Sequence, residues 1–202
     1  MPVFSFKTIQ APSEGQFRDR GSRFLAFAFP VHDEDEVKEL LAALQKKYFD
    51  SRHQGYAYMI GPERQRWRAF DDGEPNHTTG DPILGQIRSR GLTNVLVVVV
   101  RYFGGTKLGV SGLITAYRSA AADALDHATV VEREVMTSLE LEFDFVSTPE
   151  VMRLIKDYSL IIRRQEYQEK TLLTLDVPLR VDEKLRDRIA LLQATGSRIV
   201  LH

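Results

Sequence analysis

The sequence contains no cysteine. That absence excludes disulfide bonds, zinc–thiolate sites, iron–sulfur clusters and a cysteine nucleophile, and a reducing cytoplasm is the simplest location for such a chain. The apolar run Val95–Val100 is far too short for a bilayer-spanning helix, which needs about 20 apolar residues. Residues 1–15 lack the charged and apolar regions of a signal peptide. We therefore expect a cytoplasmic protein with no membrane partner.

Neither sign of charge dominates. The 27 Lys and Arg residues against 28 Asp and Glu residues give a formal net charge of −1. Proteins that coat nucleic acid through bulk electrostatic attraction carry a large excess of positive charge. Any site for a polyanion in this chain must therefore be a local patch.

The pattern of residues 1–131 predicts a mixed α/β domain. Val95–Val100 has no polar alternation, which is typical of a strand buried on both faces at the centre of a sheet. A helix is expected after Asp33, which with Glu36 fits a capping box. A second helix is expected from about Ser111 to His127, where small alanines would let it lie close to the sheet.

The pattern changes in residues 132–202. Thr137–Phe145 alternates between apolar and acidic residues, as a half-buried strand does. Ser147–Glu150 fits a capping box at the start of a helix, and two strands, a second helix and a last strand follow. The order βαββαβ predicts a ferredoxin-like domain, so we expect two domains, 1–131 and 132–202.

Four segments resemble the motifs of the YigZ/IMPACT family, in the family's order. They are GSRFLA at Gly21–Ala26, HQGYAY at His53–Tyr58, DDGEPNHTTGDPIL at Asp71–Leu84 and RYFGGTKLGVSGLITAY at Arg101–Tyr117. The chain departs from the family pattern at Gly55, where many members carry cysteine, and at Asn76 and His77, which replace the more usual Ser-Gly. The chain is identified as a member of this family, in its bacterial YigZ-like branch.

This resemblance implies an α+β fold and a link to translation. It implies an N-terminal domain like domain IV of elongation factor G, of the ribosomal-protein type, and a C-terminal domain similar to domain V of that factor. Eukaryotic relatives regulate translation by competing for an activator of the kinase that phosphorylates an initiation factor. Bacterial relatives are usually suspected of binding nucleic acid or the ribosome because of their fold, and a fold alone does not establish a function.

The glycine-rich segment that follows the central strand is the first candidate site. Its glycines bring backbone N–H groups within reach of a ligand, and a helix start beside it favours anions. We predict an anion or nucleic-acid site made by Arg101, Tyr102, Gly104, Gly105, Lys107, Ser111 and Arg118. Tyr102 and Phe103 could stack on bases. The alternative is a tight structural turn, in which Arg101 pairs with Asp71 or Asp72 and the aromatic rings fill the core.

The acidic loop at residues 71–82 is the second candidate site. Its side chains could bind Mg²⁺ or Ca²⁺, but its glycines and prolines already explain the segment as turns, so we predict no metal and no cofactor. His53 could act as a general base with one of the loop aspartates, although no nucleophile motif accompanies it. The weak catalytic candidates are therefore His53, Asp71, Asp72 and Glu74, and the other loop residues with ligand atoms are His77 and Asp81.

Three functions remain open at this point. The leading hypothesis is a translation-associated binding protein rather than an enzyme. It would contact RNA, the ribosome or a translation-regulatory protein through the glycine-rich loop. The alternative is an enzyme that acts on a phosphorylated small molecule or nucleotide with His53 and the acidic loop. A third is an adaptor that uses the exposed face of the C-terminal sheet. The sequence does not predict the oligomeric state.

Overall fold

The computed structural model describes residues 2–202. The chain is α+β and divides into two compact units. The first comprises residues 6–133, and the second comprises residues 134–202 together with residues 2–5. In the described part of the chain, no helix combines the length and the apolar character that crossing a bilayer requires.

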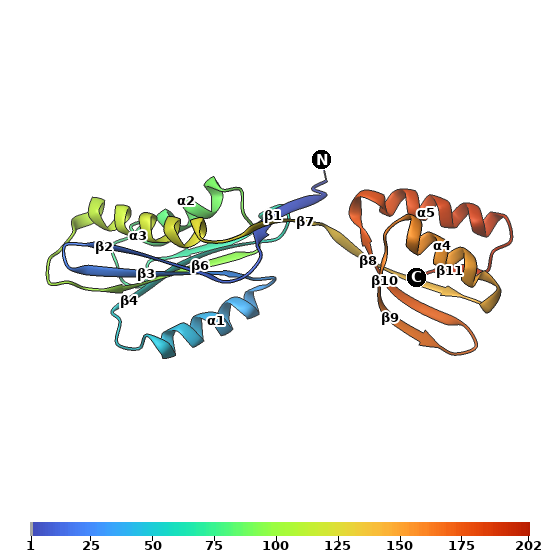
Figure 1. The fold of residues 1–202 in the computed structure, drawn as a ribbon, viewed down its shortest axis with the longest axis horizontal. Coiled ribbons are helices and arrows are strands. Elements are labelled where there is room, and N and C mark those ends of the chain that lie inside the picture. The colour runs from blue at the N-terminus through green and yellow to red at the C-terminus, as the bar shows by residue number, and fades with distance from the viewer. Residues whose placement is uncertain (1) are drawn as a thin grey trace. The chain divides into compact units, whose positions relative to one another are not determined.

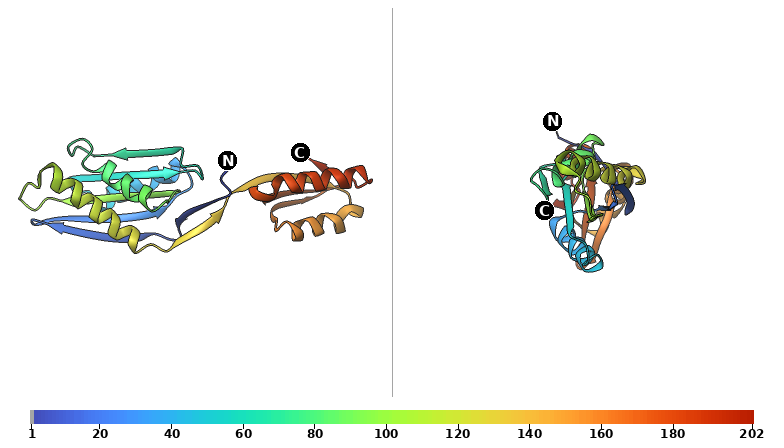
Figure 2. Two further views of the ribbon diagram at one scale, coloured as in Figure 1. Left: turned by 90° about the horizontal axis from the view of Figure 1, so that it is seen from above. Right: turned by 90° about the vertical axis from the view of Figure 1, so that its left-hand side faces the viewer.

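The first unit is built on a five-stranded antiparallel sheet (Figure 1). In their order across the sheet, the strands are β2 (Ser13–Asp19), β3 (Ser22–Pro30), β6 (Val95–Tyr102), β4 (His53–Ile60) and β5 (Arg66–Phe70). One helix covers one face and two cover the other, as Figure 2 also shows: α1 (Glu34–Lys47), then α2 (Gly80–Ser89) and α3 (Gly109–Asp126). A separate two-stranded sheet pairs β1 (Ser5–Ile9) with β7 (Val130–Glu134).

The central strand β6 confirms the prediction made from its unbroken apolar sequence. Val95, Val97 and Val99 pack in the core beneath α2 and α3, whereas Leu96, Val98 and Val100 pack in the core beneath α1. Because successive side chains of a strand point to opposite faces, a strand covered on both faces needs apolar residues at every position.

The predicted close approach of the alanine-rich helix is confirmed. A Cβ atom added to Gly15 of β2 would lie 2.2 Å from the backbone nitrogen of Ala124 in α3. Ser13 donates its hydroxyl to the carbonyl of Ala124 at 2.7 Å. The small side chains of α3 therefore bring its backbone against the edge strand.

Two helix starts differ in how well the sequence predicted them. Asp33 caps α1 and accepts from the N–H groups of Asp35 and Glu36, as expected. The amphipathic pattern of residues 83–90 predicts a helix there, but α2 begins earlier, at Gly80, because the Asp71 carboxylate accepts from the Gly80 N–H at 2.8 Å.

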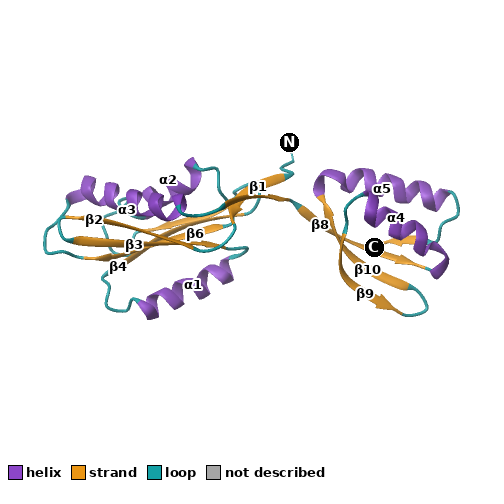
Figure 3. Cartoon of the chain, in the orientation of Figure 1, coloured by secondary structure: helices purple, strands orange, loops and turns teal. Residues whose placement is uncertain are grey.

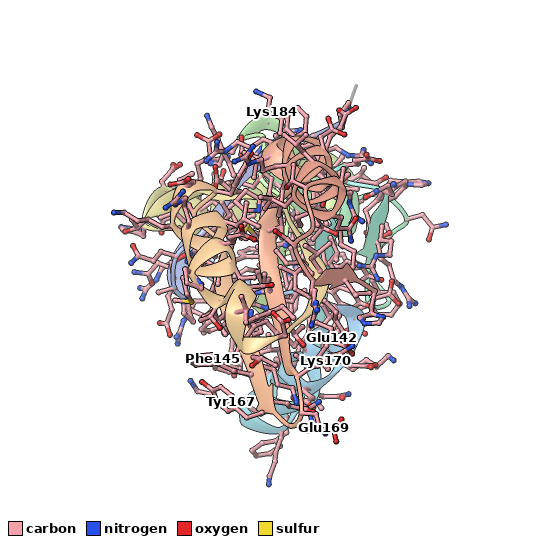
Figure 4. The ribbon with its side chains drawn as sticks, turned by 90° about the vertical axis from the view of Figure 1, so that its right-hand side faces the viewer. Glu142, Phe145, Tyr167, Glu169, Lys170 and Lys184 are labelled. Carbon is pink, nitrogen blue, oxygen red and sulfur yellow. The ribbon has the colours of Figure 1, made fainter. Side chains whose placement is uncertain are left out.

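The second unit has the predicted ferredoxin-like plan. Its four-stranded antiparallel sheet has the order β11-β8-β10-β9, with both helices on one face (Figures 1 and 3). In chain order the elements are β8 (Met136–Phe143), a short 3₁₀ turn, α4 (Thr148–Asp157), β9 (Ile161–Tyr167), β10 (Thr171–Pro178), α5 (Leu179–Ala194) and β11 (Ile199–Leu201). Figure 4 shows Lys170 beside Glu142, to which it donates at 2.5 Å.

The capping box predicted at Ser147–Glu150 is wrong. The Ser147 backbone is helical, with φ −83° and ψ −2°, whereas a residue that caps a helix start needs an extended backbone. Its N–H and hydroxyl bond instead to Asp144, and Glu150 accepts from the Ser197 hydroxyl. The serine lies within the 3₁₀ turn that precedes α4, so it does not adopt the backbone conformation of a helix cap.

Candidate functional site

Three residues form a row across one end of the first sheet. Arg101 on β6 lies opposite Phe24 on β3 and opposite His53 on β4. Cross-strand partners share a face, so all three point to the side covered by α3. On this face of β6 the valines of the core are followed by Arg101. The row therefore places polar side chains at the edge of the apolar core.

Arg101 belongs to a buried network with Glu74 and Tyr117. Its Nη1 donates to Oε1 of Glu74 at 2.6 Å, and the Tyr117 hydroxyl donates to the same oxygen at 2.9 Å. The side chains of Arg101 and Glu74 are only 7% and 5% exposed. Burial, and then the Glu74 carboxylate, raise the pKa of Tyr117 well above its ordinary value. The hydroxyl therefore keeps its proton and remains a donor.

The alternative interpretation of the sequence expected Arg101 to pair with Asp71 or Asp72. Its partner in the structure is Glu74. The guanidinium also lies between two rings, with Cζ 5.6 Å from the ring centre of Phe24 and 5.5 Å from that of Phe103. Arg101 therefore forms part of a wall and is not an exposed phosphate contact.

The two aspartates of the acidic loop hold backbone N–H groups. Asp71 accepts from the N–H groups of His77, Thr79 and Gly80 at 2.8 to 2.9 Å. Asp72 accepts from the Gln54 N–H at 2.7 Å. Each carboxylate thereby fixes the fold of the loop against its neighbours.

The predicted catalytic pairing of His53 with an aspartate carboxylate is not formed. His53 Nδ1 lies 2.8 Å from the backbone carbonyl oxygen of Asp72. A carbonyl oxygen only accepts, so Nδ1 carries the hydrogen, and the neutral ring keeps its lone pair on Nε2. Within residues 2–202, no three His, Asp or Glu side chains converge as ligands for a metal ion.

The glycine-rich loop packs tightly at one end and is open at the other. A Cβ atom added to Gly104 would lie 1.9 Å from the backbone carbon of Gly21, and the Gly104 N–H donates to Ser22 Oγ at 3.1 Å. Gly104 thus serves the packing of two motifs, contrary to its predicted part in an anion site. Gly105, with φ +88°, and Lys107 are exposed.

The start of α3 is without a side-chain cap. Leu108 precedes the helix and forms no capping hydrogen bond, and the first turn carries no acidic residue. The first N–H groups of a helix have no partners within the helix, and they give that end a partial positive charge. This end of α3 lies directly after the exposed Lys107.

Tyr102 and Arg118 lie away from this loop end. Tyr102 packs on the α1 side of the sheet, and its hydroxyl donates to Asp50 at 2.8 Å. That hydrogen bond, with burial, raises the Tyr102 pKa. The sequence had suggested that Tyr102 and Lys107 belong to one site, and the structure places them apart. Arg118 and Ser111 are exposed, and their spacing of seven residues places them about 10 Å apart along α3.

A hollow of about 470 Å³ lies between the row and the start of α3. Five of the residues singled out from the sequence meet there: His53, Glu74, Arg101, Phe103 and Lys107. Gly109, one of the loop glycines, also lines the hollow, and the sequence reasoning missed the other walls, which are Arg52, Pro75, Leu108, Val110 and Leu113. Apolar residues in a helix usually indicate core packing, and the sequence pointed to this region only through the glycine-rich loop and the expected helix start beside it.

Comparisons with known proteins agree with these motifs. Residues 20–125 match the model of the Impact N-terminal domain. IMPACT family member YvyE of Bacillus subtilis is 32% identical over 83% of this chain and 77% of its own length. An IMPACT family member of Thermus thermophilus is 45% identical over 66% of this chain and 69% of its own length. Protein IMPACT of Rattus norvegicus is 37% identical over 45% of this chain and 30% of its own length.

A solved structure covers both units. The crystal structure of a hypothetical protein superposes with a TM-score of 0.76 at 25% identity, over 99% of this chain and 97% of the other. Together with the matched domain and the relatives, this agreement settles the classification. The chain belongs to the IMPACT family.

Proposed function

We propose that the chain is a translation-associated protein that binds RNA, as such or within the ribosome, through the open end of its glycine-rich loop. The observation that carries this proposal is the uncapped start of α3 beside Lys107, with no acidic residue in the first turn. Backbone N–H groups at a helix start favour phosphate oxygens. The link to translation comes from the resemblance to the IMPACT family.

The exposed surface next to this point suits a strand of RNA. Phe103 is 44% exposed and can stack on a base. Arg118, about 10 Å along the same helix from Ser111, can meet a second phosphate. Because the whole chain carries a net charge of only −1, the attraction depends on these few groups.

The proposal is tested by titrating a labelled single-stranded RNA at several salt concentrations. Affinity should fall as salt rises, and Lys107→Ala and Arg118→Ala should each reduce the salt dependence by about one phosphate contact. Lys46→Ala on α1 is the matched control, because this exposed lysine lies on the opposite side of the sheet. Affinity that does not depend on salt, or equal effects of all three changes, would contradict the proposal.

The same variants test the link to the ribosome. Co-sedimentation of the chain with ribosomes should weaken with Lys107→Ala and remain with Lys46→Ala. The enzymatic alternative has less support in the geometry, because the carboxylates of Asp71 and Asp72 are engaged with backbone N–H groups.

A further inference from the structure

The hollow at the start of α3 has an apolar side that an RNA backbone contact does not need. Phe103, Leu108, Val110 and Leu113 line it. Phe103 and Val110 are 44% and 58% exposed, so their apolar surface faces solvent. Sites for small ligands combine such walls with a few well-placed polar groups. This side of the hollow therefore fits a planar or apolar body.

The opposite side of the hollow fits an anion. Lys107 and the uncapped start of the 18-residue helix α3 provide positive charge and free N–H groups. A second observation is independent of the helix. Arg101 lines the hollow with its side chain only 7% exposed, and its buried Nε has no hydrogen-bond partner among the described residues. Buried polar groups in native proteins are nearly always bonded, so this N–H is a donor that a water molecule or a ligand group in the hollow can satisfy while Nη1 stays with Glu74.

His53 supplies an acceptor on the same wall. Because Nδ1 is bonded to the Asp72 carbonyl, the neutral ring offers the lone pair of Nε2. An exocyclic amino group of a nucleobase is a donor of the matching kind. The hollow thus brings together an aromatic ring, an acceptor and an anion-binding helix start.

We propose that this hollow binds a single nucleotide, with the phosphate at the start of α3 beside Lys107 and the base against Phe103 and the apolar wall. The inference rests on the proposed function and deepens it, because it shares the helix start, Lys107 and Phe103 with the RNA contact and adds the hollow as a pocket for one base and its phosphate. The nucleotide can come from two sources, a free nucleoside monophosphate or one unit of an RNA chain, and the chemistry of recognition is the same.

The probes that separate these sources are AMP, adenosine, inorganic phosphate and a 5′-phosphorylated oligoadenylate, each titrated into the full chain by calorimetry. AMP should bind at least ten times more tightly than adenosine or inorganic phosphate, since only AMP fills both sides of the hollow. If AMP binds and the oligoadenylate does not compete, the source is the free nucleotide. If the oligoadenylate displaces AMP, an RNA unit is accepted.

A pair of variants at Val110 tests the location. Val110→Glu places a carboxylate in the first turn of α3, where it suits the helix dipole but repels a phosphate. Val110→Gln has nearly the same shape without the charge. AMP affinity should be at least tenfold lower in Val110→Glu than in Val110→Gln, because the two side chains differ in charge and hardly in shape. Both variants should fold, because position 110 is largely exposed.

Two results would overturn the inference. One is AMP binding no tighter than adenosine and inorganic phosphate. The other is AMP binding that Val110→Glu and Val110→Gln affect equally. These results are distinct from a failure of the proposed function, because RNA binding that depends on salt and Lys107 would persist without an AMP site. Conversely, AMP binding without RNA binding would leave this inference standing alone.

Discussion

Replacing Glu74 by alanine should destabilise the first unit severely. Glu74 is 5% exposed and its partner Arg101 is 7% exposed, so the change leaves a buried guanidinium without its counter-charge. Removing one partner of such a pair costs about 3–5 kcal/mol. The Tyr117 hydroxyl loses its acceptor in the same step. We therefore expect the free energy of unfolding of this unit to fall by about 3–5 kcal/mol.

Removing both charges should cost less than the two single changes together. Much of the penalty of a broken pair comes from the charge left behind. In the double variant Glu74→Leu with Arg101→Met, no buried charge remains. The loss should be about 0.5–3 kcal/mol smaller than the sum of the losses in Glu74→Leu and Arg101→Met, which is the range measured for residues in contact.

Unfolding by urea, followed by tryptophan fluorescence, measures these effects. Trp67 is the one tryptophan of the chain and lies on β5 of the first unit, so its signal reports on the unit that contains the network. A loss below about 1 kcal/mol for Glu74→Ala would refute a large buried-pair penalty. Full additivity in the double variant would refute the coupling of the two side chains.

Three further predictions concern the same region. The Tyr117 pKa is higher in the folded chain than in the unfolded one, so at alkaline pH the folded state keeps a proton that the unfolded state releases. The free energy of unfolding should therefore fall as pH rises above about 10. Urea titrations between neutral and alkaline pH should show a shallower fall in Tyr117→Phe. Gly55→Ala should lower the free energy of unfolding by about 1–3 kcal/mol, because its Cβ would lie 1.8 Å from Thr79 Cγ2. Adding Thr79→Ser, which removes that methyl group, should restore thermal stability. If stability is not restored, the strain lies elsewhere. Asp71→Ala should lower the free energy of unfolding by about 1–2 kcal/mol through lost bonds to the start of α2, while the exposed Glu39→Ala should change it little.

The sequence predicted those elements that local pattern determines. The apolar run of β6 and the Asp33 cap of α1 were read correctly, because each depends on neighbours within a few residues. Strand β2, with the sequence SEGQFRD, was not predicted. Its polar residues give no clear alternation, and contacts more than a hundred residues away hold it, such as the bond of the Gln16 N–H to Asp123. Tertiary contact overrides local preference in such a strand.

The pairing of Arg101 shows the same limit within the site. The sequence offered three acidic residues in one loop, at positions 71, 72 and 74. Which of them reaches Arg101 depends on how the loop turns. Asp71 faces the N–H groups before α2, and Asp72 bonds to β4. Only Glu74 remains for the core, and this result follows from the folded loop rather than from spacing.

The four family motifs meet in one place, and this meeting changes how they should be interpreted. Gly21 packs against Gly104, His53 bonds to the carbonyl of Asp72, and Glu74 joins Arg101. A set of motifs held together in this way is accounted for by a buried network as well as by a binding surface. The two accounts predict different mutants. Changes in the network should lower stability first, whereas changes on the rim of the hollow, at Lys107 and Val110, should lower binding and leave stability intact. Separating these two classes of variant is therefore what connects the motifs to a function.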